Sequence, residues 1–409
     1  MKVDFEVVCR EGELGPMLAA AFLIRQGCRV MFLPPRCQRD SDPKFLFPVV
    51  RGCPARQLSA LLPELSPPPA EIFSWKFVGR EGAAGRLPEL AGRGAAIFPS
   101  GAWAELDELY RVIDRLMVAG LEMPVASIAG IWRMLRTLIT EQKLRENRGQ
   151  TLRQWLAEFD QPVAEERLWS ALTPLTALQR FVDPPLLAYA YGLRTLLAPE
   201  VWIDLRRLRE RLVGDLLARG ACRINEDWFP VFDGKWFIGV GAGQKASCRA
   251  TVFLADADPG VLLREISPPQ QRRDFRRQFL LEEPGFICRC EVADENAEPD
   301  GVGGYQLDCG PDFSKNLYSV PAETSTGKAL YSFSPAACGW EWENGDHWGW
   351  QARLPAMMGA GFLPLQGSFR RFYQVGWHNL PGFGLGGLIY SAHRAAMTVL
   401  RKDLHRELG

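Results

Sequence analysis

The apolar residues at the start of the chain follow the pattern of two buried strands around a helix. Val3 to Cys9 is a short apolar run, and Cys28 to Leu33 is a second one. Between them, Pro16 to Gln26 is rich in Ala and Leu and follows a turn marked by Gly12 and Gly15. Short apolar runs bounded by turn residues are typical of buried parallel strands. The pattern therefore predicts a βαβ unit.

The remaining sequence alternates between segments with a helical pattern and segments with a strand pattern. Apolar residues recur at helical spacing in three stretches, Ala104–Ala119, about Ala126–Ala198 and Leu205–Arg219. Strand-like runs follow at Ala221–Trp228, Trp236–Gly241, Ala246–Leu254 and, between Phe286 and Arg353, at Asn316–Val320 and Ala329–Phe333. The tail predicts a strand at Phe372–Gly376, a glycine loop and a final helix from about Gly386 to Leu404.

The order of these elements predicts a mixed α/β fold with a discontinuous Rossmann-like domain. A βαβ start and a closing strand-loop-helix imply that the two ends of the chain meet in space. We expect this dinucleotide-binding-type domain to comprise residues 1–100, 205–265 and 355–409. Residues 101–204 and 266–354 would form an inserted substrate or partner domain of helices and antiparallel strands.

Composition and charge narrow the class of protein. The 409 residues are 47% hydrophobic, enough for a large core. The 48 basic residues balance 48 acidic ones, so no global field attracts nucleic acid, although a local surface could still touch a membrane. Acidic residues in Met1–Glu6 do not fit a signal peptide, and Met17–Ile24, the longest apolar run, is too short to cross a bilayer. We expect a cytoplasmic protein.

Candidate catalytic and metal-binding residues are scarce. None of the ten cysteines has the two-residue spacing of a zinc or redox motif, so we expect reduced thiols and no metal site. Cys288 and Cys290 would face the same side of a strand, which leaves a redox pair open. His347 and His378 lie near candidate segments, but no Ser-His-Asp, zinc or phosphate-loop constellation accompanies them. The pattern identifies no catalytic residue.

Two segments of unusual composition are candidate surfaces. Gln270–Phe279 interleaves four arginines with two phenylalanines on a predicted helix. An anionic partner or lipid headgroups would suit it, but we favour a solvated helix face with Phe275 and Phe279 in the core. Trp340–Trp350 alternates tryptophan with acidic residues, which fits either a half-buried strand or a partner-binding or pocket-lining segment.

The turn of the βαβ unit keeps two of the three glycines of the dinucleotide fingerprint. Those glycines allow a tight turn, close approach to a pyrophosphate and close packing of helix on strand. Arg10 stands at the first position, while Gly12 and Gly15 keep the second and third. Pro34 ends the second strand, where an acidic side chain would receive the ribose hydroxyls. The shape is kept while the ligand chemistry is changed.

Three parts of the chain together resemble the flavin-dependent oxidoreductases of the phytoene desaturase and amine oxidase group. Phe5–Leu33 has the rhythm of the family's opening βαβ unit. Val252–Pro259 is similar to its strand with an Asn-Ala-Asp-Pro-like turn. The third part resembles the closing flavin loop and helix, and comprises Phe372–Trp377, Pro381–Gly384 and Ser391–Ala396. The resemblance runs from the first strand to the last helix and implies an FAD/NAD(P)-binding domain.

The resemblance implies FAD as the cofactor, with three departures that weaken its site. The cofactor-binding residues that it implies are Gly12, Gly15, Arg10, Gly376, Gly382 and Gly384. Trp377 stands where the closing loop usually carries an acidic residue. Arg10, Pro34 and Trp377 therefore all replace residues that would contact the same cofactor. Arg10 could pair with a pyrophosphate, but at this cramped position we expect its side chain to occupy the cofactor groove instead.

Two functional hypotheses follow. The departures favour a pseudoenzyme with weakened or lost flavin binding, which acts as a binding or assembly subunit for an unknown protein partner or an apolar small molecule. The GDP-dissociation inhibitors of small GTPases resemble these oxidoreductases and bind no flavin. The alternative is an active FAD-dependent oxidoreductase or desaturase acting on an apolar substrate, in which the isoalloxazine ring supplies the chemistry.

Overall fold

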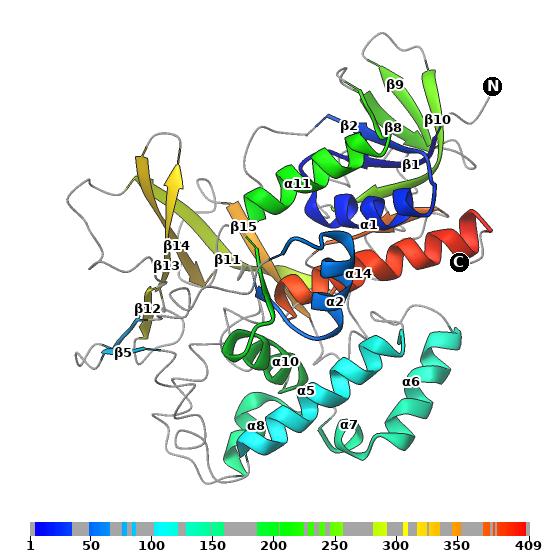
Figure 1. Ribbon diagram of the computed structural model, residues 1–409. Helices are drawn as coiled ribbons and strands as arrows, with labels where there is room; N and C mark the ends of the chain where they lie inside the picture. The colour runs from blue at the N-terminus through cyan, green and yellow to red at the C-terminus, as the bar shows by residue number, and fades with distance from the viewer. Residues whose placement is uncertain are drawn as a thin grey trace.

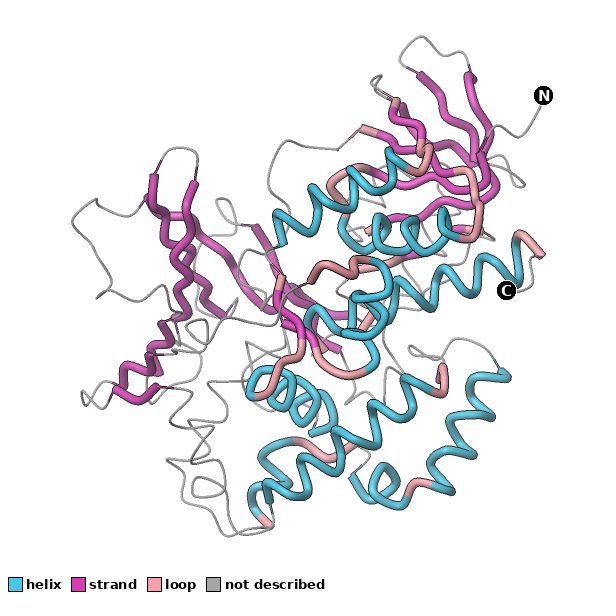
Figure 2. The backbone as a smooth tube through the Cα atoms, in the orientation of Figure 1, coloured by secondary structure: helices cyan, strands magenta, loops and turns pink. Residues whose placement is uncertain are grey.

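The computed structural model describes most helices and strands of the chain and part of the connections between them (Figures 1 and 2). The described residues are 5–34, 49–65, 76–79, 84–86, 102–121, 128–147, 149–158, 186–203, 205–224, 228–232, 237–241, 246–256, 281–292, 306–309, 317–324, 327–335, 346–352, 371–376, 379–380 and 383–405.

A seven-stranded sheet gathers strands from both ends of the chain. Its strands are β1 (Phe5–Arg10), β2 (Val30–Leu33), β7 (Cys222–Arg223), β8 (Trp228–Phe232), β9 (Phe237–Gly241), β10 (Ala246–Ala255) and β16 (Phe372–Gln374). The order is β7-β2-β1-β10-β9-β8, with β16 also paired to β10. The pairs β7-β2, β2-β1, β1-β10 and β10-β16 are parallel, whereas β8 and β9 join antiparallel. The predicted mixed α/β fold with a Rossmann-like sheet is confirmed.

Three helices lie side by side against this sheet in Figure 1. They are α1 (Leu14–Arg25), α11 (Leu205–Ala218) and α14 (Gly384–Thr398), and α14 continues into a π-helical turn, η4 (Val399–Asp403). Helix α1 packs against both of the others. Since α1 opens the chain and α14 closes it, the prediction that the two ends meet in space is confirmed.

The start of α1 lies two residues before the expected start at Pro16. The helix begins at Leu14, which places Pro16 inside the first turn. Proline is tolerated there because the first backbone N–H groups of a helix have no partner within it. Nearly every residue of α1 is buried, so its sequence reads as continuously apolar.

A layer of further helices packs beneath α14. These are α2 (Cys53–Leu61), α5 (Ala102–Val118), α6 (Ile128–Thr140), α7 (Gln142–Asn147), α8 (Leu152–Ala157) and α10 (Leu186–Leu197). Helix α2 contacts both α14 and α5, and α5 also contacts α10. The short antiparallel pair β3 (Val49–Val50) and β6 (Val201–Trp202) lies beside them. The predicted helical layer is confirmed over the described part of that stretch.

A second seven-stranded sheet is built mainly from the chain between α11 and β16. Its order is β15-β11-β14-β13-β12-β4-β5. The strands are β4 (Lys76–Gly79), β5 (Ala84–Arg86), β11 (Leu281–Val292), β12 (Gln306–Cys309), β13 (Leu317–Thr324), β14 (Gly327–Pro335) and β15 (Asp346–Ala352). Because β4 pairs with β12, the early chain contributes to both sheets. The expected domain boundaries stay a prediction.

None of the described helices combines the length and apolar character that crossing a membrane requires.

Candidate functional site

The turn between β1 and α1 carries the candidate dinucleotide residues. Strand β1 ends at Arg10, and helix α1 begins at Leu14. Gly12 has a φ of 89°, a backbone conformation that residues with a Cβ rarely adopt. Glu13 precedes the helix with an extended backbone and makes no side-chain cap to it. Gly12 therefore provides the left-handed backbone conformation of this turn.

Arg10 lies buried across the ends of the first two strands. It pairs with Leu33 in the register of β1 and β2, and only 4% of it is exposed. Its Nη1 donates a hydrogen bond to the carbonyl oxygen of Pro34, at 3.3 Å. Of the three departures from the family pattern, Arg10 and Pro34 are thus in direct contact. The guanidinium lies against the end of β2, where a fingerprint acid would receive a ribose.

Two acidic residues of the same turn reach the neighbouring strands. Glu11 accepts a hydrogen bond of 2.6 Å from Nε of Arg223 in β7, and a second guanidinium nitrogen completes a bidentate ion pair. Glu13 accepts a hydrogen bond of 2.8 Å from the backbone N–H of Asp256, directly after β10. With Arg10 on β2, the turn is tied to three strands on both sides of β1.

The acidic side chains of this turn act on the buried thiol beside it. Burial raises the pKa of the Cys9 thiol well above its usual range, and the charges of Glu13 and Glu11 raise it further. The N-terminus of a helix ordinarily favours an anion such as a pyrophosphate. Here the carboxylate of Glu13 lies beside that position, whereas the charge of Glu11 is paired with Arg223. A carboxylate at the start of α1 disfavours a second anion there.

Gly15 joins the opening helix to the closing strand. A Cβ at this position would lie 2.1 Å from the carbonyl oxygen of Val375, closer than any side chain allows. Val375 follows β16, and its N–H donates to Ala255 at 2.9 Å. Gly15 thus serves the close packing of helix on strand that the fingerprint predicts. Its role toward a cofactor stays a prediction.

The closing loop is held by its own backbone and by one amide side chain. The N–H of Gly376 donates to Oδ1 of Asn379 at 2.8 Å, and Asn379 is fully buried. Gly384 opens α14 with a φ of 52°, and a Cβ there would meet open space. Trp377 and Gly382 lie outside the described residues. Whether Gly376, Gly382 and Gly384 contact a flavin stays a prediction.

The first turn of α14 packs against buried aromatic rings. A Cβ at Gly386 would lie 2.7 Å from the hydroxyl oxygen of Tyr191, and a Cβ at Gly387 would lie 2.7 Å from Cβ of Phe383. Tyr191 is fully buried, stacks on Tyr110 and touches the ring of Phe383, at centroid distances of 5.6 and 4.8 Å. The glycines at the start of α14 therefore allow aromatic side chains of the protein to pack directly against the helix.

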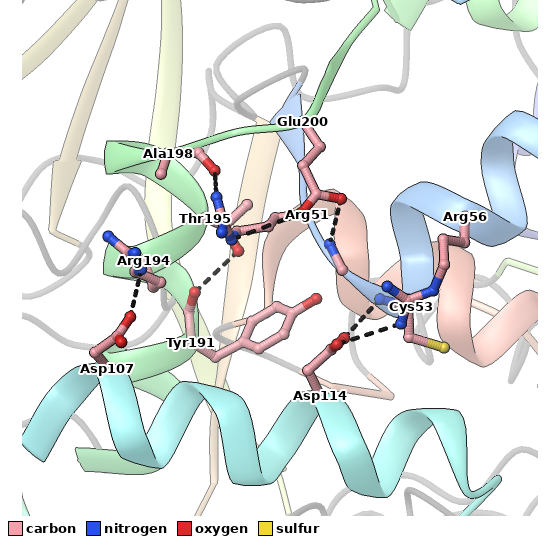
Figure 3. Close-up of polar contacts among 11 residues, drawn as sticks. Arg51, Cys53, Arg56, Asp107, Asp114, Tyr191, Arg194, Thr195, Ala198 and Glu200 are labelled. Carbon is pink, nitrogen blue, oxygen red and sulfur yellow. Dashed lines mark hydrogen bonds and ion pairs between the residues drawn. The ribbon is translucent and has the colours of Figure 1, made fainter.

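A second polar cluster ties α2 to α5 and to the end of α10 (Figure 3). Asp114 of α5 accepts hydrogen bonds from the backbone N–H of Cys53, at 2.6 Å, and from Nη2 of Arg56, at 3.3 Å. Arg51 donates to the carbonyl of Ala198, and its Nε lies 3.8 Å from a carboxylate oxygen of Glu200. The N-terminus of α2 is therefore occupied by an acidic side chain of the protein itself.

The sequence interpretation missed the acidic residues that flank helix starts. Glu11 and Glu13 were visible in the turn, and a carboxylate beside a helix N-terminus is itself a signal. Asp114 could not have been found in this way, because it lies 61 residues from its partner Cys53.

Most of the other candidate residues from the sequence lie wholly or partly outside the described residues. Strand β11 contains Cys288 and Cys290, as predicted, but their side chains lie outside the described residues, as do Gln270–Phe279 and His378. The predicted strand in the tryptophan-rich segment is confirmed only as β15, from Asp346 onward. Among the described residues, no group of three or more His, Cys, Asp or Glu side chains could hold a metal ion.

Comparison with known proteins identifies the fold. No family model matches the sequence, and neither does any curated protein. A putrescine oxidase bound to putrescine is 13% identical with a TM-score of 0.57, over 97% of this chain and 99% of that one. Cyclohexylamine oxidase from Brevibacterium oxydans IH-35A is 14% identical with a TM-score of 0.55, over 98% and 100%.

An oxidoreductase from Methanosarcina mazei is similar to the same degree. It is 12% identical with a TM-score of 0.58, over 97% of this chain and 100% of that one. At such identities the likeness shows the fold and no more. The chain therefore has the fold of the amine oxidase group of flavoproteins, as the sequence predicted, along essentially its whole length.

Proposed function

We propose that this protein keeps the flavoprotein oxidoreductase scaffold but binds flavin weakly or not at all, and acts as a binding or assembly subunit. The observation that carries the proposal is the set of contacts at the turn between β1 and α1. Arg10 binds Pro34, and Glu13 binds the N–H of Asp256. These contacts support the proposal because, in the fingerprint that the sequence resembles, the same turn would receive the dinucleotide.

Displacing these side chains would cost free energy. Arg10 is buried and hydrogen-bonded, and separating a buried charged group from its partner costs about 1–3 kcal/mol or more. A diphosphate at the start of α1 would also approach the carboxylate of Glu13. Both effects weaken binding, and every 1.4 kcal/mol is about a tenfold loss of affinity.

The scaffold is held together by direct contacts between protein groups. Gly15 packs on the carbonyl of Val375, and Gly386 packs on Tyr191. These contacts join the opening helix, the closing strand and the helical layer. A scaffold joined in this way suits a subunit that presents surfaces to a partner, which we expect to be a protein or an apolar small molecule.

Flavin content tests the proposal directly. The purified full-length protein is incubated with excess FAD, dialysed and examined for flavin absorbance, and affinity is measured by titration calorimetry. We expect no stoichiometric flavin and a dissociation constant far weaker than micromolar. Retention of stoichiometric flavin after dialysis would contradict the proposal and favour the FAD-dependent oxidoreductase acting on an apolar substrate.

A gain-of-binding variant tests the cause. Arg10→Gly combined with Glu13→Ala removes the two side chains and leaves the net charge unchanged. We expect measurably tighter FAD binding than in the wild type. The matched control is Glu210→Ala with Arg211→Ala, a charge-neutral pair on the exposed face of α11. Equal affinity in both variants would mean that the turn does not determine flavin binding.

A further inference from the structure

Helix α6 exposes an unusual amount of apolar surface. Seven large hydrophobic side chains are exposed among the described residues, and five of them belong to this helix: Ile128, Ile131, Trp132, Leu135 and Ile139. Ile128 is 76% exposed and Trp132 is 69% exposed. A scattered exposed apolar residue is ordinary, whereas a contiguous apolar patch marks an interaction surface.

The spacing of these residues places them on one face. Each of the positions 128, 131, 132, 135 and 139 has another of the set three or four residues away, which is the repeat of one helix face. The buried residues Gly130, Met134 and Leu138 form a separate stripe that packs inward. Helix α6 is therefore apolar on two faces. One serves the fold, and the fold leaves the other facing solvent.

The charges of α6 all have one sign. Between Ile128 and Thr140 the charged residues are Arg133 and Arg136, and both are exposed. The next acidic residue, Glu141, is already bonded to Arg115 at 3.3 Å. Although the protein as a whole has no net charge, this helix presents two cations beside its apolar face.

We propose that α6 docks the protein onto an anionic lipid surface, with its apolar face in the headgroup region. Leucine, isoleucine and tryptophan beside arginine are the composition of helices that lie in a membrane interface. The arginines would meet anionic headgroups, and Trp132 would place its amphipathic ring at the level of the headgroups. With 13 residues, α6 can lie on a bilayer but not cross it.

A second copy of the chain fits this face less well. A two-fold interface brings the same patch of both copies together, so it would gather four arginines at one interface. Like charges across an interface disfavour association. Figure 1 shows α6 at the edge of the helical layer, on the far side of α5 from α10.

Vesicle flotation tests this proposal with the full-length protein. The probes are vesicles of phosphatidylcholine alone and of phosphatidylcholine mixed with phosphatidylglycerol. We expect binding to the mixed vesicles that weakens as salt is raised, and weaker binding to neutral ones. No binding to the mixed vesicles would overturn the proposal.

Two double variants locate the surface. Ile131→Ser with Trp132→Ser removes apolar area, and we expect binding to fall about tenfold or more. Arg133→Gln with Arg136→Gln removes two charges, and we expect about a tenfold loss on anionic vesicles with little change on neutral ones. All four side chains are exposed, so circular dichroism should show both variants folded.

Matched controls change the same chemistry elsewhere. Leu217→Ser alters an exposed apolar residue of α11, and Arg211→Gln with Arg401→Gln removes two exposed charges outside α6. Both controls should bind as the wild type does. Equal losses in controls and α6 variants would overturn the proposal. So would a dimer, measured by sedimentation, that the Ile131 and Trp132 variant dissociates while vesicle binding persists. Flavin content does not enter these outcomes, so they are independent of the proposed function.

Discussion

The carboxylate of Glu13 accepts a hydrogen bond of 2.8 Å from the backbone N–H of Asp256. This contact joins the start of α1 to the end of β10, two segments 243 residues apart in the chain. It also places a negative charge where a helix N-terminus would otherwise attract an anion. One side chain therefore supports the fold and opposes a phosphate ligand.

Removing this carboxylate should destabilise the fold. We expect Glu13→Ala to lower the free energy of unfolding by about 1–3 kcal/mol, because the Asp256 N–H loses a charged acceptor in a partly buried position. Urea denaturation measures the change. Glu64→Ala, at an exposed position, is the control and should stay within about 0.5 kcal/mol of the wild type. Equal stability of the two variants would show that the contact contributes nothing.

The packing of Gly15 gives a second prediction. Gly15→Ala should destabilise by several kcal/mol, on the order of an overpacked core, since its Cβ would overlap the Val375 carbonyl. Gly214→Ala is the matched control within α11, where a new Cβ meets nothing within 4 Å. There alanine should stabilise by about 0.5–1 kcal/mol through helix propensity. The midpoint of thermal unfolding, measured for both variants, checks the prediction. A shift of both midpoints in the same direction would contradict it.

The third prediction compares two buried tyrosines, of which only one has a hydroxyl that is hydrogen-bonded within the described residues. The hydroxyl of Tyr373 donates to Oδ2 of Asp403 at 2.6 Å, whereas the buried hydroxyl of Tyr191 has no hydrogen-bond partner in the described part of the chain. Tyr373→Phe should cost about 1.5–3 kcal/mol, because Asp403 loses a donor. Tyr191→Phe should be neutral or stabilising. Chemical denaturation distinguishes them, and a larger loss for Tyr191→Phe would contradict the assignment.

His393 makes stability depend on pH. Burial, together with the charge of Arg394, lowers its pKa to about 4. It is held by Gln57, with 3.1 Å between the two nitrogens, and by an edge contact with Phe22. In the unfolded chain its pKa is about 6.5. The unfolded state therefore binds the additional proton, and stability falls as pH drops below about 6.5.

Comparing variants isolates this effect. Between pH 7 and pH 5 the wild type should lose about 2 kcal/mol more than His393→Gln, because glutamine at position 393 does not titrate. His405→Gln, at an exposed site, should behave as the wild type does. Denaturation midpoints measured across this range check the prediction. Parallel pH curves for all three proteins would remove His393 as the cause.

Local patterns in the sequence determined the elements and the fold class. Apolar runs and their periods predicted β1, α1, β2 and α14 to within a few residues, because a strand or helix buried on most sides must be apolar at most positions. The structural roles of Gly12 and Gly15 could also be predicted from the sequence, since a turn with positive φ and a close backbone approach both require glycine. These properties depend on residues near one another in the chain.

Only the tertiary structure decided which groups meet. The contacts of Glu13 with Asp256 and of Cys53 with Asp114 join distant segments, and no local period encodes such a pairing. The sequence of α6 likewise does not show which of its two apolar faces is buried. Packing buries Met134 and Leu138 and leaves Trp132 exposed, because one helix can bury only the face that its neighbours cover.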